Sequence, residues 1–64
     1  MARLRVHQAE AAIADLSTAI DLNPKDAQAY RFRSQAYVAA GHDMRRAIDD
    51  DAQAIRLDPK LARR

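Results

Sequence analysis

Apolar residues follow a helical spacing along most of this chain, and the first such segment is the longest. Residues 3–22 contain no Gly or Pro and are rich in Ala and Leu, which favour helices. One apolar stripe runs through them, formed by Val6, Ile13, Leu16 and Ile20. Asn23 then precedes Pro24, and a residue before proline is pushed out of the helical region. The pattern therefore predicts a first helix over about 3–22.

A second helix is predicted over about 26–40. The side chain of Asp26 can accept hydrogen bonds from the backbone two or three residues on, which is the role of an N-cap. Gly41 follows the last helical residue, where a positive φ is often needed. In a helical projection at about 100° per residue, Tyr30 and Tyr37 lie on one side and Phe32 lies nearly opposite.

A third helix is predicted over about 44–57, with Asp43 as its N-cap and Pro59 after its end. Its apolar face is expected to consist of Met44, Ala47, Ile48 and Ile55. Asp51 lies in the middle of this face, where an unpaired buried carboxylate would be costly. Two arrangements are open: Asp51 faces water, or Asp51 pairs with Arg33. We favour exposure, because charged side chains are rarely fully buried.

Two segments of the chain repeat each other at a spacing of 35 residues. Residues 12–25, AIADLSTAIDLNPK, lie over residues 47–60, AIDDDAQAIRLDPK, and eight of the fourteen pairs are identical. Self-similarity at such a period is typical of arrays of stacked helices.

The order of aromatic, small and apolar residues resembles the tetratricopeptide (TPR) repeat, a helix–turn–helix unit of about 34 residues. The resemblance depends on the apolar positions of the third helix and on Tyr30, Ser34, Tyr37, Gly41 and Pro59. It implies an all-α fold, an antiparallel helix-turn-helix repeat of the kind that builds an α-solenoid. Two positions depart from the family pattern, because Arg33 and Asp51 stand where the family has large apolar residues.

The resemblance also divides the chain, which is expected to form a single TPR-like unit over 1–64. Residues 1–23 would be the second helix of a partial repeat, 24–59 a complete repeat, and 60–64 the start of a further helix or a tail.

Composition excludes several classes of function. The 64 residues allow one small domain, and domains of this size have limited cores. Eleven basic and nine acidic residues leave a net charge of +2 with the signs mixed, which argues against a nucleic-acid footprint. The chain has no Cys, no apolar run long enough to span a membrane and no visible secretory signal. We therefore expect a cytoplasmic protein, and the richness in Ala, Arg and Asp favours a bacterial source.

Residues suited to catalysis or metal binding are scarce. His42 and Asp43 are more simply a turn residue and an N-cap than part of a metal site. Asp49, Asp50 and Asp51 point in three directions around a helix and cannot converge on one cation. The sequence therefore predicts no enzyme activity, no cofactor and no metal.

Binding of a protein or peptide partner is the function that the resemblance implies. In TPR proteins the first helix of each repeat lines the groove that takes a partner. By resemblance, the partner-binding residues here are Gln28, Arg31, Phe32, Gln35 and Val38. Arg31 and Gln35 lie four residues apart and could hold a carboxylate, as in the clamp of chaperone-binding TPR proteins. Phe32 either anchors a partner or packs on a neighbouring repeat or subunit.

Three functions are thus compatible with the sequence. The first is a non-catalytic protein–protein interaction scaffold. The second is a self-assembling structural module whose helices exchange or stack between chains, because so few repeats leave apolar sides open. The third and weakest is an RNA-binding helical repeat that would use the scattered arginines. On the first two readings we expect a homo-oligomer or a part of a longer repeat array, with nucleic acid and membrane unlikely as partners.

Overall fold

The computed structural model describes residues 2–41 and 44–62, and their regular structure is entirely helical. Three α-helices, α1 (Ala2–Leu22), α2 (Ala27–Ala40) and α3 (Met44–Leu57), are followed by a short 3-10 helix, η1 (Pro59–Ala62). The described ranges contain no strand. The expected all-α class is confirmed, and each α-helix ends within one residue of its predicted bounds.

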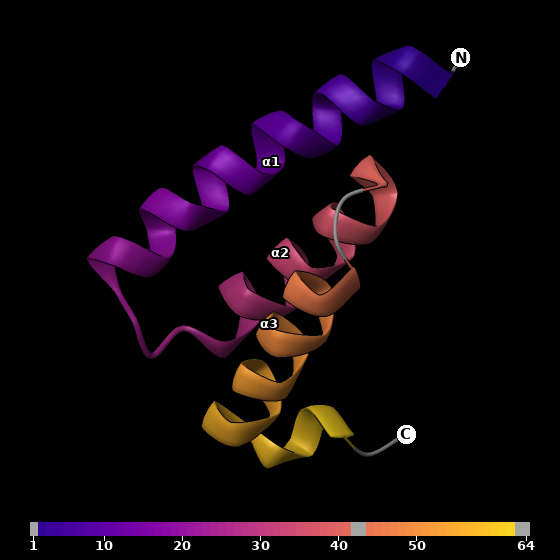
Figure 1. Ribbon diagram of the computed structural model, residues 1–64. Helices are drawn as coiled ribbons and strands as arrows, with labels where there is room; N and C mark the ends of the chain where they lie inside the picture. The colour runs from indigo at the N-terminus through magenta and orange to yellow at the C-terminus, as the bar shows by residue number, and fades with distance from the viewer. Residues whose placement is uncertain (1, 42–43, 63–64) are drawn as a thin grey trace.

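The second helix occupies the centre of the arrangement (Figure 1). α2 packs against α1 on one side and against α3 on the other, and α3 in turn contacts η1. Within the described ranges α1 and α3 do not pack on each other. α2 and α3 form a helical hairpin, while α1 crosses over the first of these two helices (Figure 1).

The ends of α2 are closed by the residues that the sequence indicates. Asp26 Oδ1 accepts hydrogen bonds from the backbone nitrogens of Gln28 at 3.1 Å and Ala29 at 3.3 Å. Gly41 has a φ of 72°, in the left-handed region, and its amide donates to the carbonyl of Val38 at 3.1 Å. Both predicted caps are therefore present. The expected N-cap of α3, Asp43, and its neighbour His42 lie outside the described residues.

The stripe predicted on the first helix faces α2. Ile20 is buried, and Ile13 and Leu16 are half-buried, together with the buried Ala9 one turn earlier. The fourth expected member, Val6, lies outside the described side chains.

Small residues form most of the core. No large side chain is fully buried in the described part of the chain. The buried apolar residues are Ala9, Ile20, Ala29, Ala36, Ala47 and Ala54. Such small side chains let helix backbones approach closely, and Ser34 Oγ donates to the carbonyl of Ala47 at 2.7 Å across the contact between α2 and α3. Alanine methyl groups and this hydrogen bond thus make up much of the contact between these two helices.

The apolar face expected for α3 is wrong at two of its four residues, since Ala47 is buried and Ile55 half-buried but Met44 and Ile48 are not. Met44 and Ile48 are 56% and 64% exposed, so they do not face α2. The buried side of α3 consists of Ala47, Asp50 and Ala54. α3 turns this side toward α2 because alanines allow close approach and because Asp50 finds a cationic partner there. The outward residues Met44, Ile48 and Ile55, of which Ile55 is half-buried, are called the α3 strip below.

Candidate partner-binding surface

A polar junction between the three helices fixes the orientation of α2. Arg33 Nε donates to Asp50 Oδ2 at 2.7 Å, and Arg33 Nη2 donates to Asp50 Oδ1 at 2.8 Å. Arg33 Nη1 also donates to Ser17 Oγ at 3.2 Å, so one guanidinium from α2 reaches both α1 and α3. The side chains of Arg33 and Asp50 are only 19% and 10% exposed. Two parallel hydrogen bonds make this a strong and directional ion pair.

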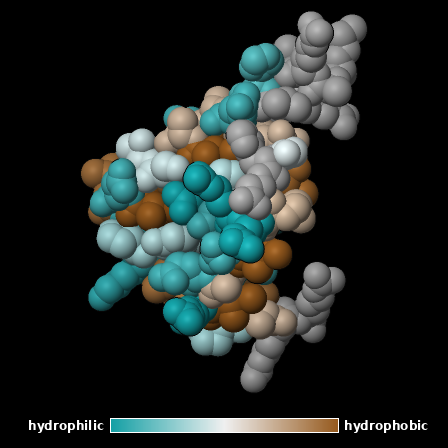
Figure 2. Space-filling view, in the orientation of Figure 1, coloured by the Kyte–Doolittle hydropathy of each residue, from teal (hydrophilic) through white to brown (hydrophobic). Residues whose placement is uncertain are grey.

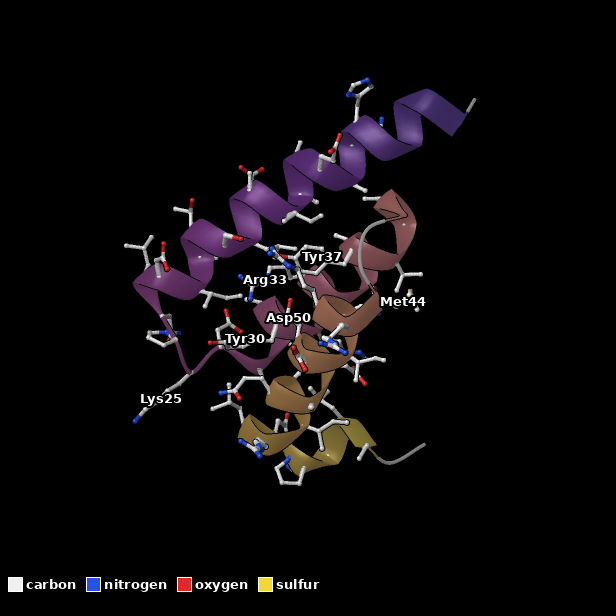
Figure 3. All side chains as sticks on the ribbon, in the orientation of Figure 1. Lys25, Tyr30, Arg33, Tyr37, Met44 and Asp50 are labelled. Atoms are coloured by element: carbon white, nitrogen blue, oxygen red, sulfur yellow. The ribbon has the colours of Figure 1, made fainter. Side chains whose placement is uncertain are left out.

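Two tyrosines enclose the arginine. The guanidinium carbon of Arg33 lies 5.7 Å from the ring centroid of Tyr30 and 5.9 Å from that of Tyr37, which is the range of cation–π attraction. Figure 3 shows these residues and Asp50 gathered between the helices, whereas Lys25 and Met44 point away from the centre. The hydrogen bond from Arg33 to Asp50 and the charge of Asp50 raise the pKa of Arg33 further above its ordinary value, and burial opposes this.

The partner proposed for Arg33 requires a correction. Arg33 pairs with Asp50 and not with Asp51, because Asp50 shares the face of α3 that Ala47 and Ala54 turn toward α2. Asp51 is exposed, as expected.

The junction leaves the opposite side of α2 open. All of the partner-binding residues that the sequence indicated are exposed there: Gln28, Arg31, Phe32, Gln35 and Val38, called the α2 face below. Phe32 and Val38 are each 50% exposed, so each offers apolar surface for contact. The helical projection therefore placed the two sides of α2 correctly.

A groove of about 430 Å³ runs along one edge of the α2 face. Its lining residues come from α2, α3 and η1 and are Arg31, Gln35, Asp51, Ile55, Lys60, Leu61 and Ala62. Of the residues predicted from sequence, the structure brings Arg31 and Gln35 into this groove. Gln28, Phe32 and Val38 share the α2 face but are not part of the lining.

The groove combines charge of both signs with apolar surface. Arg31 and Lys60 supply positive charge and Asp51 supplies negative charge, while Ile55 and Leu61 are half-buried at its wall. The wall formed by η1 is held in place by the turn before it, because Asp58 Oδ1 accepts from the amide of Lys60 at 3.2 Å. Such a lining can hydrogen-bond a peptide backbone or a carboxylate and cover a small apolar side chain.

Sequence reasoning missed the half of the groove that α3 and η1 contribute. Asp51 and Ile55 lie four residues apart, as do Arg31 and Gln35, so each pair lies along one side of its helix. That spacing could have been used to predict the contribution of α3. The sequence gives no comparable indication for Lys60 and Leu61, because their place depends on how the chain turns after Pro59.

The visible surface shows no continuous apolar patch (Figure 2). Brown hydrophobic patches are separated by hydrophilic teal and by paler areas in this view. None of the described helices combines the length and apolar character needed to cross a bilayer. In the described part of the chain, no three His, Cys, Asp or Glu side chains gather in a way that could hold a metal ion.

The chain matches no protein-family model, no curated protein and no solved structure.

Proposed function

We propose that this chain is a non-catalytic protein–protein interaction scaffold of the TPR type, which binds a peptide or a partner helix on the α2 face and in the groove beside it. The observation that supports this most is the groove itself, since Arg31 and Gln35 of α2 open into a space completed by α3 and η1. A helix laid in a groove between helices is a common way to recognise a peptide.

The two sides of α2 make different contacts, which also supports the proposal. On one side, Arg33, Tyr30 and Tyr37 hold the three helices together. The other side of the same helix carries Phe32 and Val38, which are half exposed and have no such structural task. Aromatic side chains such as Phe32, and arginine, are typical anchors of protein interfaces.

The proposal is tested with random linear peptides displayed on phage and selected on the folded chain. Selected peptides should bind the wild-type chain and lose about tenfold or more in affinity for the Arg31→Ala and Phe32→Ala variants, because removal of an interface anchor commonly costs that much. Arg46→Ala is the matched control, since Arg46 is an exposed arginine of α3 outside the groove lining. Selected peptides that bind all three variants as well as the wild type would contradict the proposal.

A second candidate, self-assembly, is favoured by a different observation. Several large apolar side chains outside the groove are exposed, and Leu22, at 82%, and Ile48, at 64%, are the most open of them. Surface of this kind on a chain with so small a core is suited to contact with another copy. This surface overlaps that of the first candidate only at Ile55, which belongs to the α3 strip and also lines the groove.

A further inference from the structure

α1 repeats the three buried residues with which α3 faces α2, and also the leucine that ends α3. On α3 these residues are Ala47, Asp50, Ala54 and Leu57. At the spacing of 35 residues, α1 has Ala12, Asp15, Ala19 and Leu22, which are identical at all four positions. The two sets are equally spaced, so each forms one side of its helix.

The two sets differ in what covers them. On α3, Ala47, Asp50 and Ala54 are 3%, 7% and 0% exposed beneath α2. On α1, Ala12 and Ala19 are half-buried, Asp15 is exposed and Leu22 is 82% exposed. α1 meets α2 through another side, on which Ala9 and Ile20 are buried. The set on α1, called the α1 outer face below, therefore repeats the side of α3 that α2 covers, but its Asp15 and Leu22 are left exposed.

The contacts of α2 with α3 show which groups such a face binds. Asp50 accepts two hydrogen bonds from Arg33 at 2.7 and 2.8 Å. The next residue of α2, Ser34, donates to the carbonyl of Ala47 at 2.7 Å. The alanines leave room for the helix backbone to come close enough for both contacts. A helix that presents arginine followed directly by serine or threonine can form both kinds of hydrogen bond with such a face.

We propose that the α1 outer face binds a helix of a partner protein that presents an arginine followed by serine or threonine. Asp15 takes the arginine, as Asp50 takes Arg33, and the docked helix covers Leu22. Charge complementarity supports the assignment, since none of the described residues forms an ion pair with Asp15. This surface lies on a different helix from the groove, so the inference goes beyond the proposed function.

A second folded copy of the chain does not meet this requirement. Its own Arg33 is already paired with Asp50 and enclosed by Tyr30 and Tyr37, so that arginine has no free carboxylate-binding edge to offer. The helix that docks on this face is therefore one whose arginine is exposed.

The chain itself supplies the probe. A labelled peptide of residues 26–41, DAQAYRFRSQAYVAAG, reproduces α2 with both of its caps. Fluorescence anisotropy should show saturable binding to the intact chain, and amide shifts in NMR spectra should centre on Asp15, Ala19 and Leu22. A free helix of this length is marginal in water, but the cost of ordering it is common to closely related peptides and cancels in their ratios.

Variants of the chain distinguish binding at Asp15 from a general effect of negative charge on α1. Asp15→Asn should weaken binding of the peptide about tenfold, because it removes the charge from a pair with two hydrogen bonds. Asp21→Asn is the matched control, since Asp21 is an exposed aspartate of α1 outside the α1 outer face, and it should leave affinity unchanged.

The peptide variants make the same comparison from the other side. Arg33→Gln in the peptide should weaken binding about tenfold, whereas Arg31→Gln, which also removes one positive charge, should not. Asp15→Arg in the chain should restore binding of the Arg33→Glu peptide, because the charges are then exchanged.

Four results would overturn the proposal. The first is the absence of saturable binding, and the second is an equal loss from Asp15→Asn and Asp21→Asn. The third is a set of NMR shifts centred on Asp50 and Ala54, which would mean that the peptide displaces α2. The fourth is a shift of Asp15 with protein concentration in the absence of peptide, which would assign the face to a second copy.

Discussion

Arg33 is the residue on which the three helices converge. It forms the ion pair with Asp50, a hydrogen bond with Ser17 and cation–π contacts with Tyr30 and Tyr37. Because the alanine-rich core buries little area, breaking this junction from one side should cost a large share of the few kcal/mol by which small domains are stable. Its carboxylate partner is also the least exposed charge in the described structure.

Neighbouring aspartates provide the test of this junction. Asp50→Asn should lower the free energy of unfolding by about 3 kcal/mol, because it leaves a shielded arginine without its counter-charge. Asp51→Asn should change it by less than about 0.5 kcal/mol, since Asp51 is exposed. Urea denaturation followed by circular dichroism measures both.

A double variant distinguishes the pair from simple side-chain packing. Replacing both Arg33 and Asp50 with leucine should recover much of what either leucine variant loses, because no charge is then left buried alone. Equal destabilisation by Asp50→Asn and Asp51→Asn would show that the junction contributes little.

The bounds of a helix could be predicted from the sequence where residues within the same turn set them. Asp26 and Gly41 set the ends of α2 through bonds to residues within the same turn, so sequence alone sufficed. The buried side of α3 was not predictable in this way. Three consecutive aspartates offered Arg33 three possible partners, and the choice of Asp50 depends on how α3 rolls against α2. The groove was half predictable for the same reason, since Arg31 belongs to one helix but Asp51 and Lys60 join it through packing.

The turn after α2 gives a prediction at this scale. A Cβ added at Gly41 meets nothing within 4 Å, so the only penalty for Gly41→Ala is the positive φ of 72°. That penalty is about 1 kcal/mol, which lowers the Tm of a domain of this size by about 4–8 °C. Gly41→Asn should lower it less, because asparagine adopts the left-handed region more readily. Thermal denaturation checks both values, and a larger loss for Asn than for Ala would contradict this account.

The molecule as a whole is open on two sides. It measures 35 × 26 × 19 Å with a Cα radius of gyration of 11.6 Å, and within the described part of the chain α1 and α3 each have one face without a neighbouring helix. The α1 outer face is polar at its centre, whereas the α3 strip is apolar except for Asp51 beside it. The α3 strip is therefore the surface on which we expect chains to associate.

Opposite substitutions on this surface should move association in opposite directions. Asp51→Leu joins Met44, Ile48 and Ile55 into one apolar surface and should strengthen self-association. Ile48→Asp should weaken it with little loss of stability, since Ile48 is 64% exposed. Sedimentation velocity over a range of concentrations measures the mass in solution. A wild-type chain that stays monomeric at high concentration would rule out self-assembly through this surface.

The position of α2 between two helices that do not touch has a consequence for cooperativity. A protein with a closed core gains or loses its contacts together, but here each interface joins only neighbours in a row. Stability is then a sum of intrinsic helix terms and nearest-neighbour couplings, as in a one-dimensional lattice. In such a lattice a unit at the end has one coupling and a unit in the middle has two. Each helix added to either open side would therefore raise the stability of the whole row and turn a former end into an interior member.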